Sequence, residues 1–139
     1  MPNLSRIEPI AERFSLNIIY SFGSLAQEAA EYIKGVVETI ETNSLSDLDI
    51  GVKPRPGKYL SVKEKVQLSL ELEELFKVNH VDLVVIPEAD PFVASNIIKG
   101  ERLFCRNKHD ADEYDLYILR RAGDLAPLER ERISLIMGE

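Results

Sequence analysis

Apolar and polar positions alternate along the chain with two periods, about 3.6 and 2, which are typical of amphipathic helices and half-buried strands. Alternation predicts a strand over residues 46–52, apolar runs rich in β-branched or aromatic residues predict strands over 16–22 and 81–86, and residues 103–105 are expected to form a short extended piece. The pattern thus predicts one domain, residues 1–139, that alternates helices with strands. The helical period predicts helices over residues 4–14, 24–41, 61–76, 91–99, 110–121 and 127–137.

Local signals predict where several of these helices begin and bend. Ser61 followed by Glu64 predicts a capping box, and Asp90 before a proline predicts an N-cap. Asn3 is a possible cap for the first helix, and Gly35 is a possible bend inside the second. The expected apolar face of the helix that begins at Ser61 consists of Val62, Val66, Leu68, Leu72, Leu75 and Phe76.

Composition and charge narrow the function classes. The 139 residues carry a formal net charge of -7, which argues against a broad surface for nucleic acid, and we expect no direct nucleic-acid partner. No apolar run approaches the roughly 20 residues of a membrane span, and the N-terminus lacks the features of a signal peptide, so we expect a cytoplasmic protein without a membrane partner. A single cysteine, Cys105, excludes an internal disulfide and a multi-cysteine zinc site.

Three carboxylates lie at or in predicted strands. Asp47 and Asp49 flank Leu48 at a strand start, so we expect them on one face, roughly 6 to 7 Å apart. Asp82 lies inside the strand over 81–86 and can reach the same cluster if the two strands are neighbours. Mg²⁺ prefers carboxylate oxygens and retains waters and substrate phosphates, so the set predicts a metal-nucleotide site for displacement at phosphorus.

Gly23 and Ser24 are the complementary part of this predicted site. They stand where a strand ends and a helix begins, and a glycine there lets the backbone approach a ligand closely. Helix N-termini present free N–H groups to phosphate, and Ser24 adds a hydroxyl donor. The pair therefore predicts nucleotide binding.

These motifs, Gly23-Ser24, Ser46 to Ile50 and Val81 to Val84, resemble the signature of the DNA polymerase β-like nucleotidyltransferase superfamily. The segment from Ile97 to Phe104 resembles more narrowly the MNT (minimal nucleotidyltransferase) antitoxins, and the likeness covers about residues 20–128. The resemblance implies an α+β fold with a mixed β-sheet of three to four strands flanked by helices, similar to the polymerase β palm. It implies that Gly23 and Ser24 hold a triphosphate, and that Asp47, Asp49 and Asp82 bind Mg²⁺ and are catalytic.

The resemblance also implies a partner, a HEPT-domain toxin, and transfer of AMP from ATP to a tyrosine of that toxin. The chain departs from the family pattern, because residues 25–46 separate Ser24 from Asp47, more than twice the usual spacing. We interpret this as an outward extension of the helix over 24–41, and expect that shortening residues 28–42 preserves nucleotide binding.

Other functions stay open at the level of sequence. The protein could be a non-enzymatic antitoxin that occludes its toxin with a relic site, or a small-molecule nucleotidyltransferase of the antibiotic type. Lys53, Arg55 and Lys58 could touch a triphosphate, although a basic loop is the simpler interpretation, and His80 is interpreted as a strand-end residue. The helices over 110–138 could pack on the domain or on a partner.

Overall fold

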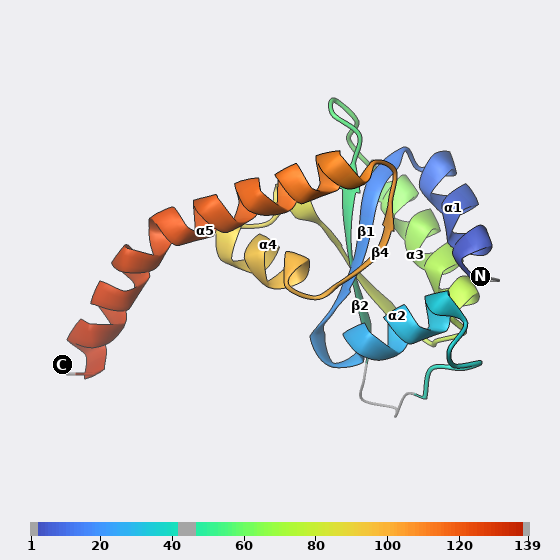
Figure 1. The fold of residues 1–139 in the computed structure, drawn as a ribbon, viewed down its shortest axis with the longest axis horizontal. Coiled ribbons are helices and arrows are strands. Elements are labelled where there is room, and N and C mark those ends of the chain that lie inside the picture. The colour runs from blue at the N-terminus through green and yellow to red at the C-terminus, as the bar shows by residue number, and fades with distance from the viewer. Residues whose placement is uncertain (1–2, 42–46, 138–139) are drawn as a thin grey trace.

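The computed structural model describes residues 3–41 and 47–137, in which a four-stranded sheet lies between two groups of helices (Figure 1). In chain order the elements are α1 (Leu4–Arg13), β1 (Leu16–Phe22), a 3-10 turn (Gly23–Leu25), α2 (Ala26–Lys34), β2 (Leu48–Pro54), α3 (Val62–Phe76), β3 (Val81–Val85), a second 3-10 turn (Ile86–Glu88), α4 (Pro91–Ile98), β4 (Glu101–Cys105) and α5 (Lys108–Met137).

The sheet is mixed and open. Its strand order is β3-β2-β1-β4, with β1 antiparallel to both β2 and β4 and with β2 parallel to β3. The predicted α+β class with a mixed, helix-flanked sheet is therefore confirmed. β3 is an edge strand, and it lies directly beside the strand that carries Asp49.

Apolar side chains fill both faces of the sheet. Helices α1, α2 and α3 cover one face, and α4 with the first half of α5 covers the other (Figure 1). Leu48, Ile50 and Val52 of β2 are buried on the α3 side, so Asp49 and Gly51 between them face α4. A Cβ added at Gly51 would lie 2.4 Å from Ile97 Cγ2 of α4, which confirms this orientation.

Of the three residues predicted to cap a helix N-terminus, two form side-chain capping hydrogen bonds. Ser61 and Glu64 form the capping box, and Asp90 accepts hydrogen bonds from the N–H groups of Phe92 and Val93 at 2.9 and 3.0 Å. Asn3 lies at the N-cap position of α1 as predicted, but its side chain makes no capping hydrogen bond and donates instead to the Tyr32 carbonyl at 2.8 Å.

The predicted helix over 24–41 is too long. α2 ends at Lys34, and Gly35 is its C-cap with φ of 80°, a left-handed conformation that glycine adopts without steric cost. The apolar spacing continues beyond that point because Ile40 is buried and Val37 packs on the core, although neither lies in a helix. Residues 42–46 lie outside the described part of the chain.

The C-terminal prediction is also wrong in one respect. The two helices predicted over 110–121 and 127–137 are one continuous helix, α5, which runs through Gly123 and Asp124. A glycine inside a helix costs only about 1 kcal/mol relative to alanine, so it does not by itself end the helix. The second half of α5 projects away from the sheet (Figure 1).

The face assigned to α3 needs one correction. Leu68, Leu72, Leu75 and Phe76 are buried as expected. Val62 and Val66, which were expected beside them, are 78% and 55% exposed. No helix within residues 3–41 and 47–137 is long and apolar enough to cross a membrane.

Shortening residues 28–42 to a tight turn is now expected to abolish cooperative folding, because α2 is part of the core. Ala29, Ala30, Tyr32 and Ile33 are buried, and the Tyr32 hydroxyl donates to the Leu75 carbonyl at 2.8 Å. Losing them removes several kcal/mol from a total stability of about 5–15 kcal/mol. Thermal unfolding followed by circular dichroism measures this, with Val36→Ser at an exposed position as the control. A sharp transition in the shortened chain would show that the segment is peripheral.

Candidate functional site

Two carboxylates lie side by side at one end of the sheet. Asp49 of β2 pairs in register with Asp82 of β3 and, on its other side, with Phe22 at the end of β1. Adjacent strands are about 4.8 Å apart, so the two aspartates and the turn after Phe22 form a row across three strands. The sequence prediction that Asp82 can reach the strand with Asp49 is confirmed by this register.

The row carries unbalanced negative charge. Desolvation raises the pKa of Asp49, and the charge of Asp82, a hydrogen bond with Asp82 and the charge of Asp47 raise it further. Like-charged groups that perturb one another in this way favour a shared proton or a cation between them. The arrangement is therefore suited to hold positive charge.

Asp47 lies just before β2 and is held by a neighbour. Its Oδ2 is 3.3 Å from His80 Nδ1, and both side chains are more than half exposed. The sequence interpretation gave His80 no role beyond ending a strand. An exposed pair of this kind contributes less than about 1 kcal/mol, so a cation could displace His80 from Asp47 at small cost.

Gly23 forms the other end of the row. Its φ is 75°, and a Cβ at this position would lie 2.3 Å from Asp49 Oδ2, so any other residue here would be strained and would force the Asp49 carboxylate to move. Ser24 follows within the 3-10 turn that leads into α2. The buried Ser21 hydroxyl donates to the Ala26 carbonyl at 2.8 Å and ties this turn to β1.

A cavity of about 480 Å³ opens beside Gly23 and Ser24. Asn96 and Lys99 at the end of α4 line it, and they add an amide and an ammonium group next to the turn. Glu28 and Glu101 line it as well, so its charge is mixed. The sequence analysis gave no role to Asn96 or Lys99, since only the fold brings α4 beside the turn.

The donor set fits a magnesium ion that arrives with a nucleotide. Among the described residues, no three His, Cys, Asp or Glu side chains form a group that could hold a metal ion by themselves. Mg²⁺ commonly uses one or two carboxylates together with substrate phosphates and waters. Asp49 and Asp82 supply two, and their mutual repulsion is the kind that a cation relieves.

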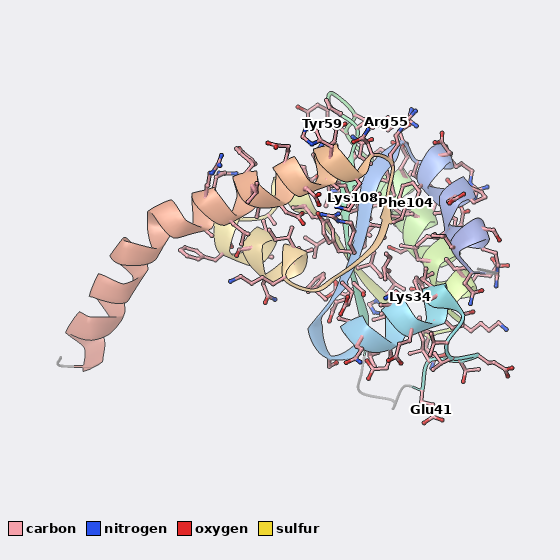
Figure 2. The ribbon with its side chains drawn as sticks, in the orientation of Figure 1. Lys34, Glu41, Arg55, Tyr59, Phe104 and Lys108 are labelled. Atoms are coloured by element: carbon pink, nitrogen blue, oxygen red, sulfur yellow. The ribbon has the colours of Figure 1, made fainter. Side chains whose placement is uncertain are left out.

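Arg55 lies at the opposite end of the sheet (Figure 2), and so do Lys53, near the end of β2, and Lys58, in the loop that follows it. Arg55 pairs with Glu12 at 3.1 Å and Lys58 with Glu64 at 2.9 Å. These pairs agree with the interpretation of the segment as a basic loop. They also lie too far from Gly23 and Ser24 for Lys53, Arg55 or Lys58 to contact a triphosphate bound there.

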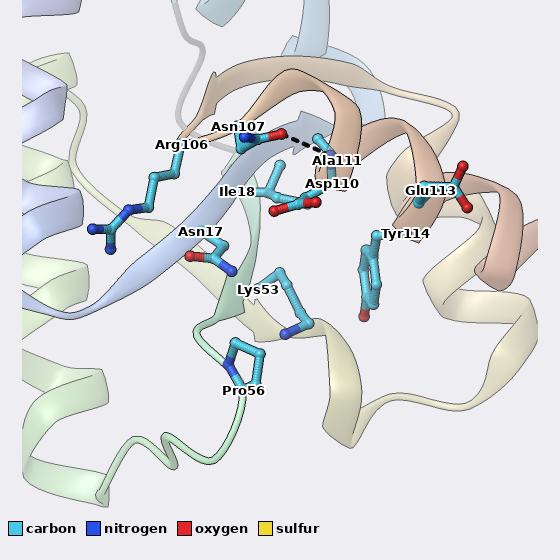
Figure 3. A pocket seen from close by; sticks show the side chains of 10 residues that line it. All are labelled: Asn17, Ile18, Lys53, Pro56, Arg106, Asn107, Asp110, Ala111, Glu113 and Tyr114. Carbon is cyan, nitrogen blue, oxygen red and sulfur yellow. Dashed lines mark hydrogen bonds between the residues drawn. The ribbon is translucent and has the colours of Figure 1, made fainter.

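A second cavity, of about 340 Å³, lies at that far end between β2 and the start of α5 (Figure 3). The Lys53 ammonium lies 5.3 Å from the centre of the Tyr114 ring and donates to the Pro54 carbonyl at 2.6 Å. Desolvation lowers the pKa of Lys53 there. This lysine is therefore occupied by interactions within the chain.

Gly23→Ala is expected to weaken binding of Mg²⁺-ATP at least tenfold, because the new Cβ would displace the Asp49 carboxylate. Gly57→Ala is a matched control, since Gly57 also has a positive φ, 82°, with open space around it. Both variants carry the same backbone strain, so the difference in affinity by calorimetry isolates the clash. Equal affinities of the two variants for Mg²⁺-ATP would show that Gly23 is not part of the nucleotide site.

Comparison with known proteins agrees with this geometry. The sequence profile described as "Polymerase beta, Nucleotidyltransferase" matches residues 5–109. The chain belongs to this nucleotidyltransferase family. No curated protein matches it.

Solved structures of toxin-antitoxin complexes share the fold over the whole chain. A toxin-antitoxin structure with AMP-PNP has a TM-score of 0.71 and 20% identity and covers 97% of this chain and 98% of its own. A structure of MntA-HepT has a TM-score of 0.67 and 18% identity, with 97% of both chains covered. A tri-AMPylated HEPN toxin in complex with MNT antitoxin, from Shewanella oneidensis, has a TM-score of 0.66 and 19% identity over 97% of this chain and 96% of its own.

Proposed function

We propose that this nucleotidyltransferase is an MNT antitoxin that transfers AMP from ATP, with Mg²⁺, to a tyrosine hydroxyl of a HEPN toxin, the class called HepT in the related complexes. One observation carries the proposal. The glycine turn suited to a triphosphate touches the Asp49 carboxylate, which in turn lies beside Asp82. Phosphate binding and acid-base groups are thus in direct contact.

The transfer is a displacement at the α-phosphorus of ATP. The tyrosine oxygen forms a new bond to this phosphorus while the bond from phosphorus to the oxygen that bridges to the β-phosphate breaks. Pyrophosphate leaves with the bonding electron pair, and the hydroxyl proton passes to the Asp82 carboxylate and then to water. Backbone N–H groups after Gly23 and the Ser24 hydroxyl hold the departing phosphates.

The carboxylates have a second role in this proposal. Asp49 and Asp82 would hold the Mg²⁺ ion, and Asp47 could join them after releasing His80. When bound, the ion would neutralise charge on the phosphates. Lys99 lies where it can pair with a phosphate oxygen on the side of Gly23 away from Asp82.

The related complexes support the acceptor class. One of them holds an AMPylated HEPN toxin and another holds AMP-PNP. At 19–20% identity these structures share the fold, and the assignment of toxin, ATP and tyrosine to this chain remains our proposal.

Two observations favour a second candidate, an antitoxin that acts by occlusion alone. Asp47 is paired with His80, and no three-ligand metal group exists among the residues that the structure describes. An Asp47→Ala, Asp49→Ala double variant separates the two functions. The enzyme proposal expects this variant to leave the toxin unmodified and active in cells, while the wild-type chain neutralises it. Unchanged neutralisation by the double variant, with no labelled toxin in either sample, would favour occlusion.

A further inference from the structure

The two ends of the carboxylate row are not equivalent. Gly23, Ser24 and the cavity beside them lie on the β1 and β4 side of Asp49, whereas Asp82 lies on the edge strand β3. In a displacement at phosphorus the attacking and leaving oxygens lie roughly in line. If the pyrophosphate leaves toward Gly23, the acceptor hydroxyl must approach from the side of Asp82 and the β3 edge.

A groove lies along that edge, between α3 and β3, with a volume of about 330 Å³. Asp82 and His80 line it, although the Asp82 side chain points, with that of Asp49, to the opposite face of the sheet, so the groove ends at the β3 edge that separates it from the carboxylate row. Val66 and Leu70 of α3 and Leu83 of β3 supply its apolar lining. A partner that occupies the groove and also passes round the β3 edge would reach Asp82.

The apolar surface extends along α3 beyond the groove. Val62, Val66 and Leu70 recur every four residues and are 78%, 55% and 59% exposed, which is unusual for three aliphatic side chains in one row. We refer to Val62, Val66 and Leu70 as the α3 stripe. Such spacing matches the packing of one helix against another.

Two of the polar groups along the groove already have partners within the chain. Lys65 pairs with Glu88 at 2.7 Å, and Glu73 accepts the Val81 N–H of the edge strand at 3.0 Å. Because that edge donor is taken, an added strand would lose a ladder hydrogen bond at its start. The exposed aliphatic side chains of the α3 stripe then offer the larger contact, which favours the apolar face of a helix.

We propose that the acceptor protein docks the apolar face of a helix on the α3 stripe and the α3–β3 groove, and that this placement brings its tyrosine hydroxyl to Asp82. The inference rests on the proposed function, because it names the surface by which that site receives its protein acceptor. In this arrangement α3 recognises the protein acceptor, and the turn at Gly23 recognises the nucleotide.

The test uses the full chain and the protein encoded by the neighbouring reading frame, which the proposed function expects to be a HEPN toxin. Val66→Glu, Leu70→Glu is the principal double variant, and Val66→Ser, Leu70→Ser repeats it without added charge. Leu116→Glu, Leu119→Glu on α5 is the matched control, since Leu116 and Leu119 are 47% and 40% exposed on another helix. Toxin affinity, Mg²⁺-ATP affinity and the rate of AMP transfer are measured for each.

Both α3 variants are expected to bind the toxin at least tenfold more weakly and to raise KM for toxin by a similar factor, with Mg²⁺-ATP affinity and melting temperature unchanged. The α5 control is expected to match the wild-type chain. Wild-type toxin affinity in the α3 variants, an equal loss in the α5 control, or no toxin binding by the wild-type chain would overturn the docking inference. Toxin binding that depends on the α3 stripe, without AMP transfer by the wild-type chain, would support the docking and overturn the proposed activity.

Discussion

Asp49→Asn is expected to lower the rate of AMP transfer by about 10²–10³-fold and to leave the fold intact. The substitution keeps the size of the side chain but removes the central charge of the row between Gly23 and Asp82. Transfer of label from ATP, measured at saturating Mg²⁺, gives the rate. Asp110→Asn, at an exposed carboxylate on the far end of the sheet, is the control and should keep the wild-type rate.

The same variant has a second expected effect, on stability without divalent ions. Desolvation and the charges of Asp82 and Asp47 raise the pKa of Asp49, so the folded state binds this proton more tightly than the unfolded state. The contribution of Asp49 is then most favourable below its unfolded pKa of about 3.9 and declines as pH rises through the folded pKa.

Urea unfolding in EDTA at several pH values measures this decline. The wild-type chain should lose more stability than Asp49→Asn between pH 4 and pH 7, and added Mg²⁺ should restore stability in the wild-type chain more than in the variant. Parallel pH profiles for the two chains would mean that Asp49 is not under electrostatic stress.

Asp115→Ala is expected to destabilise the fold by about 3 kcal/mol, because Asp115 joins α5 to the sheet. It accepts a hydrogen bond from the hydroxyl of the fully buried Tyr20, and its Oδ2 lies 2.7 Å from Arg102 Nη2 of β4. Removal of the carboxylate leaves both the hydroxyl and the guanidinium without this partner in a half-buried setting. The midpoint of urea unfolding should fall, with the slope unchanged.

Asp112→Ala is the matched control for this effect. Asp112 also pairs with Arg102, at 3.0 Å, and with Lys108, at 2.9 Å, but its side chain is about half exposed. Solvent screens such an exposed pair, so its loss is expected to change stability little. Equal losses in the two variants would show that the buried hydroxyl and guanidinium do not determine how α5 is held.

Local sequence chemistry predicted the elements on which the site depends. β-branched runs identified β1, β2 and β3, and the capping box at Ser61 and the cap at Asp90 identified two helix starts. The pairing of Asp49 with Asp82 could also be predicted from the sequence, because both aspartates lie in short predicted strands that need only be neighbours in the sheet. The strands and helix caps depend on residues close together in the sequence, and the aspartate pair depends only on how β2 aligns with β3.

The errors arose where tertiary contacts override the local pattern. Val37 and Ile40 continue the helical spacing of α2 but pack on the core from irregular structure after Gly35. Val62 and Val66 share the helical spacing of an apolar face and yet are exposed to solvent, because the sheet contacts the face that carries Leu68, Leu72, Leu75 and Phe76. His80 beside Asp47, and Lys99 beside Ser24, depend on contacts between segments far apart in the sequence.

The most direct test of the central claim is a paired labelling experiment on the toxin. The chain, Mg²⁺ and its HEPN toxin are incubated with ATP labelled either at the α-phosphate or at the γ-phosphate, and the modified residue is located by peptide mass spectrometry. The account predicts that label enters a toxin tyrosine from α-labelled ATP alone and that Asp49→Asn abolishes it. Label from γ-labelled ATP, or equal α-label with Asp49→Asn, would contradict nucleotidyl transfer by the Asp49 and Asp82 pair.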